Sequence, residues 1–281
     1  MFKNLNLGAL GHSASFDVAC GLARQHGFAG IDLDLGFLGA LAAEKSVNAA
    51  RDWFAATGLK AGGFGCGAKW REGDSDAAFD ESLKALAADA KLAAALGSTR
   101  SMTWIMPASN TLSFKQHWSL VQPRLRRAAQ VLADHGCRFG LEFIGPATLR
   151  AERKFDFVHS MDAVLALAAA CGANVGLLLD AFHMYTAKTS LAELSRVSVE
   201  DVVYVHVNDG VAGRGPDEQI DQERDIVGAT GVIDIAGFIA TLRALAYAGP
   251  VTVEPFSKAV KAMSVGDAAA YTSRSLDKVL A

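Results

Sequence analysis

The sequence has no long run of residues with one sign of charge. Its 27 Lys and Arg residues are nearly balanced by 30 Asp and Glu residues, for a formal net charge of -3. Proteins that bind nucleic acid usually concentrate Lys and Arg on one face or segment, so we expect no nucleic-acid partner. Hydrophobic residues make up 51% of the chain, which is ample apolar material for a large folded core.

Paired cysteines and an apolar leader are also missing. The four cysteines, at positions 20, 66, 137 and 171, form no C-x-x-C pair, so we expect reduced thiols. The first residues lack the apolar stretch of a secretory signal, and we expect a cytoplasmic protein. The apolar run 163–179 approaches the length of a membrane span, but Gly172 and Asn174 interrupt it. We interpret it as a helix followed by a buried strand, and we expect no membrane association.

The glycine motifs that bind phosphate groups do not occur, because the sequence contains neither G-x-G-x-x-G nor G-x-x-x-x-G-K-[ST]. This absence disfavours an open, doubly wound sheet. Instead, an alanine-rich helix pattern, a glycine and a short apolar run recur along the chain. Such runs follow Gly27, Gly58, Gly97, Gly136, Gly172 and Gly249. Together with segments 4–10 and 201–209 they predict eight strands, at about 35 residues per unit, and one α/β domain over 1–281: a (β/α)8 TIM barrel.

Each of the last four predicted strands carries a side chain that can bind a metal at or near its carboxyl end. They are Glu142, Asp180, His206 and Glu254. The carboxyl ends of barrel strands surround one mouth, so these residues can converge on one point. Taken singly, Asp180 could cap a helix, the glutamates could mark strands that emerge into solvent, and His206 could be a core histidine. Four such residues together favour a shared metal site, because a buried carboxylate needs a cation.

Three carboxylates and one imidazole suit one divalent ion that accepts oxygen ligands. Mn²⁺, Mg²⁺ or Co²⁺ fits this set best, with Zn²⁺ as an alternative. Two long connections, 145–160 and 210–231, are predicted to lie at the same mouth, where barrel enzymes do their chemistry.

The segments around these residues resemble those of the xylose-isomerase-like TIM-barrel superfamily of sugar phosphate isomerases and epimerases. This group includes inosose isomerases and ketose 3-epimerases. The resemblance is carried by an ordered set of motifs: LEFIGP, GLLLDAFH, VHVND, RDIVGATGVIDI and VTVEPF. The turn after Arg224 lacks the family's proline and has a changed glycine spacing, and the lysine motif of classical xylose isomerase is absent.

The resemblance implies that Glu142, Asp180, His206 and Glu254 bind the ion. It further implies that Glu142 and Glu254 act as catalytic base and acid. In the same way it places substrate-binding roles on His183, in D-x-x-H, and on Arg224. The family also implies homodimers or homotetramers.

Further candidates come from position alone. Trp70 and Trp104 follow or end the third and fourth predicted strands, where an aromatic wall could contact substrate. Packing under loops is the alternative for both. Asp209 follows the metal histidine and could contact substrate or orient that histidine.

We therefore expect a metal-dependent isomerase or epimerase of a sugar, ketose or cyclitol, acting through an enediolate. The alternative within enzymes is a dehydratase of an inosose-like or dehydroshikimate-like hydroxyketone. A sugar-binding barrel without turnover is the non-catalytic alternative. A barrel nuclease is disfavoured, because the third and fourth predicted strands carry no histidine or carboxylate.

Overall fold

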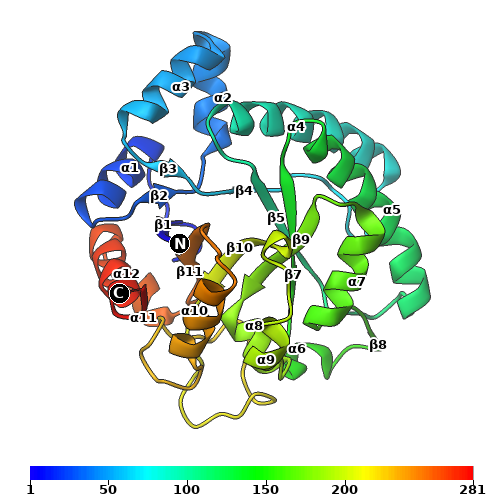
Figure 1. Ribbon diagram of the computed structural model, residues 1–281. Helices are drawn as coiled ribbons and strands as arrows, with labels where there is room; N and C mark the ends of the chain where they lie inside the picture. Colours follow the sequence, from blue (N-terminus) through cyan, green and yellow to red (C-terminus); the bar gives the residue numbers. More distant parts are fainter. Residues whose placement is uncertain (281) are drawn as a thin grey trace.

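The computed structural model describes residues 1–280, and its central feature is a parallel sheet that curls into a TIM barrel (Figure 1). The strands of this sheet are β1 (Phe2–Leu5), β2 (Gly30–Ile31), β3 (Lys60–Ala61), β4 (Phe64–Gly65), β5 (Arg100–Ile105), β7 (Arg138–Phe143), β9 (Val175–Asp180), β10 (Val202–Val207) and β11 (Pro250–Val253). Their order is β3-β2-β1-β11-β10-β9-β7-β5-β4. All eight predicted strand segments are present, and the mixed α/β class and the barrel are confirmed.

The third predicted strand is split into two short strands, β3 and β4. A Cβ on Gly62 would lie 2.3 Å from Asn4 Oδ1, and one on Gly63 would lie 2.2 Å from Met102 Cε. The glycine pair therefore lets the chain pass close to the barrel interior. β3 pairs with β2, and β4 pairs with β5, so this broken segment joins the two ends of the sheet.

Helices surround the strands, as Figure 1 shows. The longer ones are α1 (Phe16–Gln25), α2 (Leu35–Glu44), α3 (Val47–Ala56), α4 (Asp76–Ala95), α5 (Phe114–Ala133), α7 (Met161–Cys171), α10 (Ile235–Ala244) and α12 (Val265–Leu280). The shorter ones are α6 (Ala147–Arg150), α8 (Ala181–Thr186), α9 (Leu191–Leu194), α11 (Lys258–Lys261) and the 3-10 helix η1 (Val199–Asp201). Within residues 1–280, no helix has both the length and the apolar character needed to cross a membrane.

The helices end in two different ways. Gly97 and Gly136, after α4 and α5, have φ of 87° and 70°, which is the left-handed conformation that favours glycine. Gly172 instead ends α7 with an extended backbone, at φ 164°. After α10 the left-handed residue is Ala246, at φ 61°, and not Gly249. A glycine thus precedes each of these strands, but only some of these glycines have the left-handed backbone conformation that favours glycine.

The two long connections are only partly irregular. Connection 145–160 contains α6 and β8 (Phe155–Asp156), and β8 pairs in antiparallel fashion with β6 (Ala108–Ser109). Connection 210–231 folds back on β10 through a bridge between Asp209 and Asp225. Side chains from both connections line one cavity beside the carboxyl ends of the strands.

Candidate metal centre

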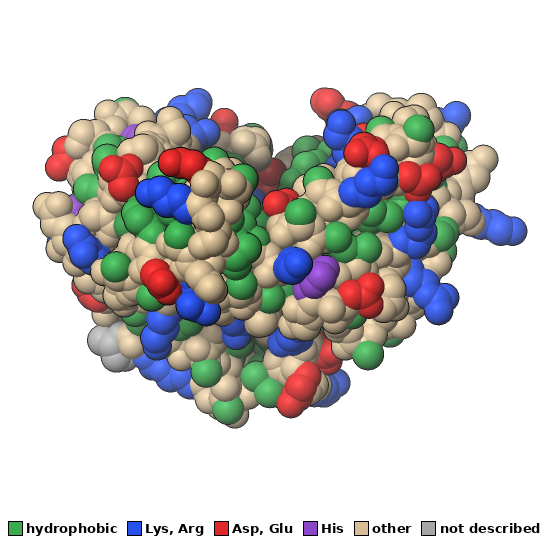
Figure 2. Space-filling view, turned by 90° about the horizontal axis from the view of Figure 1, so that it is seen from above, with side chains coloured by type: hydrophobic (Ala, Val, Ile, Leu, Met, Phe, Trp, Pro, Cys, Tyr) green, Lys and Arg blue, Asp and Glu red, His purple; other side chains and the backbone are tan. Residues whose placement is uncertain are grey.

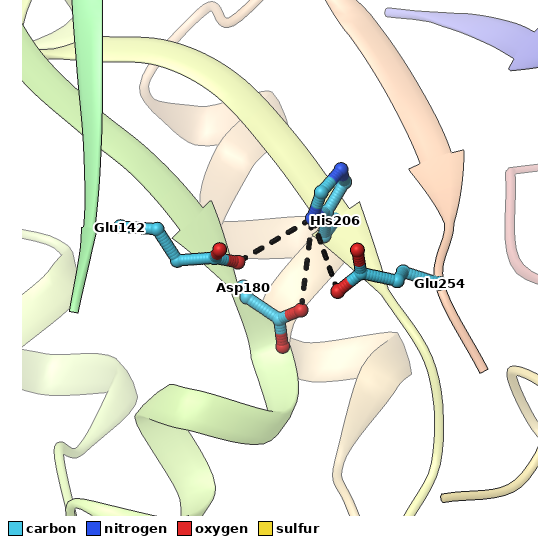
Figure 3. A group of neighbouring side chains, drawn as sticks. All are labelled: Glu142, Asp180, His206 and Glu254. Atoms are coloured by element: carbon cyan, nitrogen blue, oxygen red, sulfur yellow. Dashed lines mark ion pairs between the residues drawn. The ribbon is translucent and has the colours of Figure 1, made fainter. Parts of the chain in front are cut away.

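Four side chains from four neighbouring strands converge at the barrel mouth (Figure 3). Glu142 lies near the end of β7, Asp180 ends β9, His206 lies in β10, and Glu254 directly follows β11. One potential ligand atom from each lies within 4.8 Å of every other. The parallel register explains this grouping, because His206 pairs with Asp180 on one side and with Thr252 on the other.

His206 Nδ1 stands at the centre of the group. It lies 3.4 Å from Glu142 Oε1, 3.6 Å from Glu254 Oε2 and 3.9 Å from Asp180 Oδ2. His206 Nδ1 and Glu142 Oε1 are both buried without a hydrogen-bond partner. Buried polar atoms are normally satisfied, so two orphaned ligand atoms that face each other fit a cation between them.

Burial and mutual charge perturb the acid groups of this cluster. Burial raises the pKa of Glu142 to about 8, and the Glu254 charge adds to the rise. Burial likewise raises the pKa of Glu254. Burial opposes protonation of His206, but Glu254, Glu142 and Asp180 outweigh it and raise its pKa to about 9. Three carboxylates around one imidazole thus make a strongly negative site that attracts either protons or a metal cation.

Asp180 is held in place by its own hydrogen bonds. Its Oδ1 accepts from the backbone N–H of Phe182 at 2.6 Å and of His183 at 3.3 Å, which caps α8. Asn208 Nδ2 donates to both carboxylate oxygens, at 3.2 and 3.1 Å, and to the backbone oxygen of Glu254 at 3.2 Å. Asp180 is therefore both a helix cap and a member of the cluster.

Arg224 joins the cluster from connection 210–231. Its Nη1 lies 3.0 Å from Asp180 Oδ2 and 3.2 Å from Glu254 Oε2, and its Nη2 donates to Asp221 Oδ1 at 2.8 Å. Despite its burial, Asp180 has a pKa lowered to about 2, because the Arg224 charge stabilises its carboxylate and Asn208 donates to it. The changed glycine spacing after Arg224 has not removed this side chain from the site.

His183 lies next to the same acids. The backbone N–H of Gly145 donates to His183 Nδ1 at 3.2 Å. Burial lowers the pKa of His183 to about 4, with Arg224 adding to the effect, so the ring is neutral. Its Nε2 lies 3.1 Å from Arg224 Nη2 and 3.9 Å from Glu142 Oε1. Arg224 and His183 thus lie together beside the acids, where the guanidinium N–H groups suit a substrate oxygen.

Two cavities flank the acid cluster, and both are lined by Glu142, Glu254 and Trp104. One, of about 420 Å³, extends over β1 and β2 and includes Asn6 and Asp32. The other, of about 350 Å³, is the one that connections 145–160 and 210–231 line. Figure 2 shows the surface divided by a deep notch, with charges of both signs interspersed.

The remaining predicted site residues take different positions. Trp104 is 41% exposed and lies beside the cluster, where it pairs in register with Glu142. Trp70 is buried and lines a separate cavity next to Trp104. Asp209 is fully buried, and its carboxylate accepts backbone N–H groups of Gly210, Thr230, Gly231 and Ile233. This geometry gives Asp209 the role of ordering the turn after Arg224, in place of a substrate contact.

Sequence patterns did not identify Asp32 or Asp221. Asp32 lies just after β2 and accepts hydrogen bonds from Asn4, Asn6, Tyr204 and the backbone of Gly63. The only available signal was its place in IDLDL, at the end of an apolar run. Asp221 lies in a connection without periodicity, so only the folded loop brings it to Arg224.

Comparison with known proteins agrees with this architecture. The family model described as "Xylose isomerase-like TIM barrel" matches residues 20–278. No curated protein matches the chain in sequence. A xylose isomerase domain protein from Alicyclobacillus acidocaldarius is 29% identical, with a TM-score of 0.85 over 95% of this chain and 94% of that chain.

Two more distant structures share the fold. IolI protein with a bound zinc atom is 15% identical, with a TM-score of 0.81 over 100% of this chain and 98% of that chain. D-psicose 3-epimerase with D-tagatose, from Clostridium cellulolyticum H10, is 17% identical, with a TM-score of 0.72 over 100% of this chain and 98% of that chain.

Proposed function

Because the chain belongs to the xylose isomerase-like TIM barrel family, we propose that it is a divalent-metal-dependent isomerase or epimerase of a sugar, ketose or cyclitol. The observation that carries the proposal is the acid cluster, in which two orphaned ligand atoms lie 3.4 Å apart. Structural neighbours that are named as 3-epimerases support the reaction class.

Glu142, Asp180, His206 and Glu254 would hold the ion. When bound, a divalent ion polarises a substrate carbonyl and stabilises negative charge on the neighbouring oxygen. Mn²⁺, Mg²⁺ and Co²⁺ suit this donor set, and the zinc in one structural neighbour makes Zn²⁺ an alternative.

Glu142 and Glu254 are the proposed proton carriers. Both are carboxyl groups whose pKa is raised, chiefly by burial, which makes each a better proton acceptor than an ordinary carboxylate. One takes the proton from the carbon next to the carbonyl, which leaves an enediolate, and the other returns a proton. His183 and Arg224, which lie 3.1 Å apart beside the acids, would contact substrate oxygens.

The experiment measures whether the proton on the carbon next to the carbonyl is replaced by deuterium from the solvent. Wild-type enzyme with Mn²⁺ is incubated in D₂O with a panel of ketoses, inososes and dehydroshikimate, and deuterium at the carbon next to the carbonyl is measured by NMR. We expect deuterium at this carbon, and a product that has lost no water and in which either the carbonyl has moved to the adjacent carbon or the configuration at one centre is inverted. Glu142→Gln and Glu254→Gln should each lower turnover by about 10²–10⁴-fold.

Glu44→Gln, on the exposed face of α2, is the matched control and should keep full activity. Unchanged turnover in both site variants would remove the acid/base assignment. Loss of water from the substrate would instead identify the dehydratase, which is our alternative function.

A further inference from the structure

Next to the two cavities that flank the acid cluster lies a further one of about 410 Å³, which we call the second cavity. It shares Trp104 and Met106 with the flanking cavity of about 350 Å³, which Glu142 and Glu254 line. Residues 70–72, the segment after β5, His117 on α5 and Arg153 of connection 145–160 form its other walls. Its volume is within the usual range for a small-molecule site.

Arg71 is fixed in the wall of this cavity. Its guanidinium carbon lies over two indole rings, 4.5 Å from the centroid of Trp70 and 4.3 Å from that of Trp104. Such contacts with aromatic faces hold a guanidinium in place. Nη2 donates to Thr103 Oγ1 at 3.0 Å and to the backbone oxygen of Trp104 at 3.2 Å, whereas Nε is buried without a partner.

Two more residues of the same wall carry unpaired polar atoms. Trp70 is only 2% exposed and its Nε1 has no hydrogen-bond partner, and the same holds for Nδ1 of His117, which is 4% exposed. The carboxylate in the wall, Glu72, already accepts from the hydroxyls of Ser109 and Thr111. Arg71 Nε and Trp70 Nε1 are therefore donors of this wall that have no acceptor.

The cavity is also connected to the reaction centre. Trp104 pairs in register with Glu142, and Thr103, which binds Arg71, lines the cavity over β1 and β2. A ligand whose reacting carbons lie at Glu142 can therefore extend past the exposed Trp104 ring into the second cavity. Trp104 is 41% exposed, which leaves a ring face available for a sugar or cyclitol.

We infer that the second cavity binds an anionic group, a carboxylate or a phosphate, on the part of the substrate farthest from the reacting carbons. This inference rests on the proposed function and adds a substrate class to it: sugar acids or sugar phosphates in place of neutral sugars. Arg71 supplies the charge and Trp70 a further donor. Arg71 is held in place by the two indoles before binding, so little conformational entropy is lost on binding.

The experiment compares acidic probes with neutral ones on protein freed of metal by a chelating resin. Affinities for D-glucuronate, D-fructose 6-phosphate, D-glucose and D-fructose are measured by ligand-observed NMR. We expect at least one acidic probe to bind about tenfold or more tightly than its neutral counterpart, the effect of one charge-assisted hydrogen-bonded contact. The carboxylate and phosphate probes separate the two sources of charge.

Arg71→Met should abolish this preference, and Arg71→Lys, which keeps a positive charge but not the guanidinium, should reduce it. Arg126→Met, which removes the same charge from an exposed position on α5, should leave it intact. Equal affinity for acidic and neutral probes in the wild type, or an undiminished preference in both Arg71 variants, would overturn the inference.

Neither metal nor turnover is needed for these measurements. Glu142→Gln should therefore keep the preference for acidic probes even though it loses turnover. If the isomerase proposal fails, the binding result still stands, and if the binding result fails, deuterium incorporation is unaffected.

Discussion

At the scale of single residues, the acid cluster depends on side chains that hold its members in place. Asp180 uses one oxygen to cap α8 and directs the other toward His206 and Arg224. Asn208 fixes this orientation through both carboxylate oxygens. Because metal ligands bind well only when pre-oriented, the second layer of contacts contributes directly to ion affinity.

Asn208→Ala removes the amide that orients Asp180. We expect the affinity for Mn²⁺ to fall by about 10–100-fold, because the carboxylate can then turn away from the cluster. Isothermal titration calorimetry on metal-free protein measures this change. Asn48→Ala, at an exposed position of α3, is the control, and equal Mn²⁺ affinity in the two variants would show that Asn208 does not position Asp180.

Site residues could be predicted from the sequence where they lie at the end of an apolar strand pattern. Glu142, Asp180, His206 and Glu254 each end or follow an apolar run, so the barrel pattern alone predicted their convergence. Asp209 follows the same rule, yet its carboxylate accepts from the backbone N–H of the next residue and from three backbone N–H groups of a turn 21 to 24 residues away. Which way a side chain turns at a strand end depends on the loop that folds over it, and the sequence pattern does not contain that information.

At the scale of elements, α8 and the β7 end are packed so closely that only glycine fits between them. A Cβ on Gly145 would lie 2.3 Å from the backbone oxygen of His183 and 2.4 Å from Thr186 Oγ1. The N–H of Gly145 also donates to His183 Nδ1. The close approach thus sets the position of His183.

Gly145→Ala should push α8 away from β7. We expect a loss of about 1–3 kcal/mol in the free energy of unfolding, from overpacking, together with a large loss of turnover, because His183 moves with the helix. Chemical denaturation and a turnover assay measure the two effects.

Gly21→Ala, inside α1, is the matched control. A Cβ at this position meets no atom within 4 Å, and alanine favours a helix over glycine by about 0.8–1.0 kcal/mol. This variant should be slightly more stable and fully active. If Gly145→Ala behaves like Gly21→Ala, the packing argument for α8 is wrong.

The order and number of barrel elements were predictable because helix, glycine and apolar run recur with a regular length. The break between β3 and β4 was not, since it arises from contacts of Gly62 and Gly63 with Asn4 and Met102, which are distant in sequence. The small β6–β8 ribbon was missed for a related reason, because two-residue strands carry no periodic signal.

At the scale of the whole molecule, the four thiols report on global unfolding. Burial raises the pKa of Cys20, Cys66 and Cys137 to about 11 and that of Cys171 to about 12. A raised pKa means that the reactive thiolate is scarce at pH 8 in the folded state. The thiols should therefore react slowly with a chromogenic disulfide reagent at pH 8, and rapidly once the protein is unfolded in denaturant.

A reaction at pH 8 that is as fast in the folded as in the unfolded protein would contradict the burial of these thiols. Raising the pH from 8 toward 11 should speed the reaction of the folded protein, because the thiolate fraction grows as the pH approaches the raised pKa values.

The central claim is that one divalent ion is held jointly by the ends of β7, β9 and β10 and by Glu254. Calorimetric titration of metal-free protein with Mn²⁺ tests it most directly. We predict one ion per chain, a rise in the midpoint of thermal unfolding on binding, and loss of the site in a combined Glu142→Gln and Glu254→Gln variant that remains folded. Stoichiometric binding that survives in this variant, or no binding by folded wild-type protein, would contradict the account.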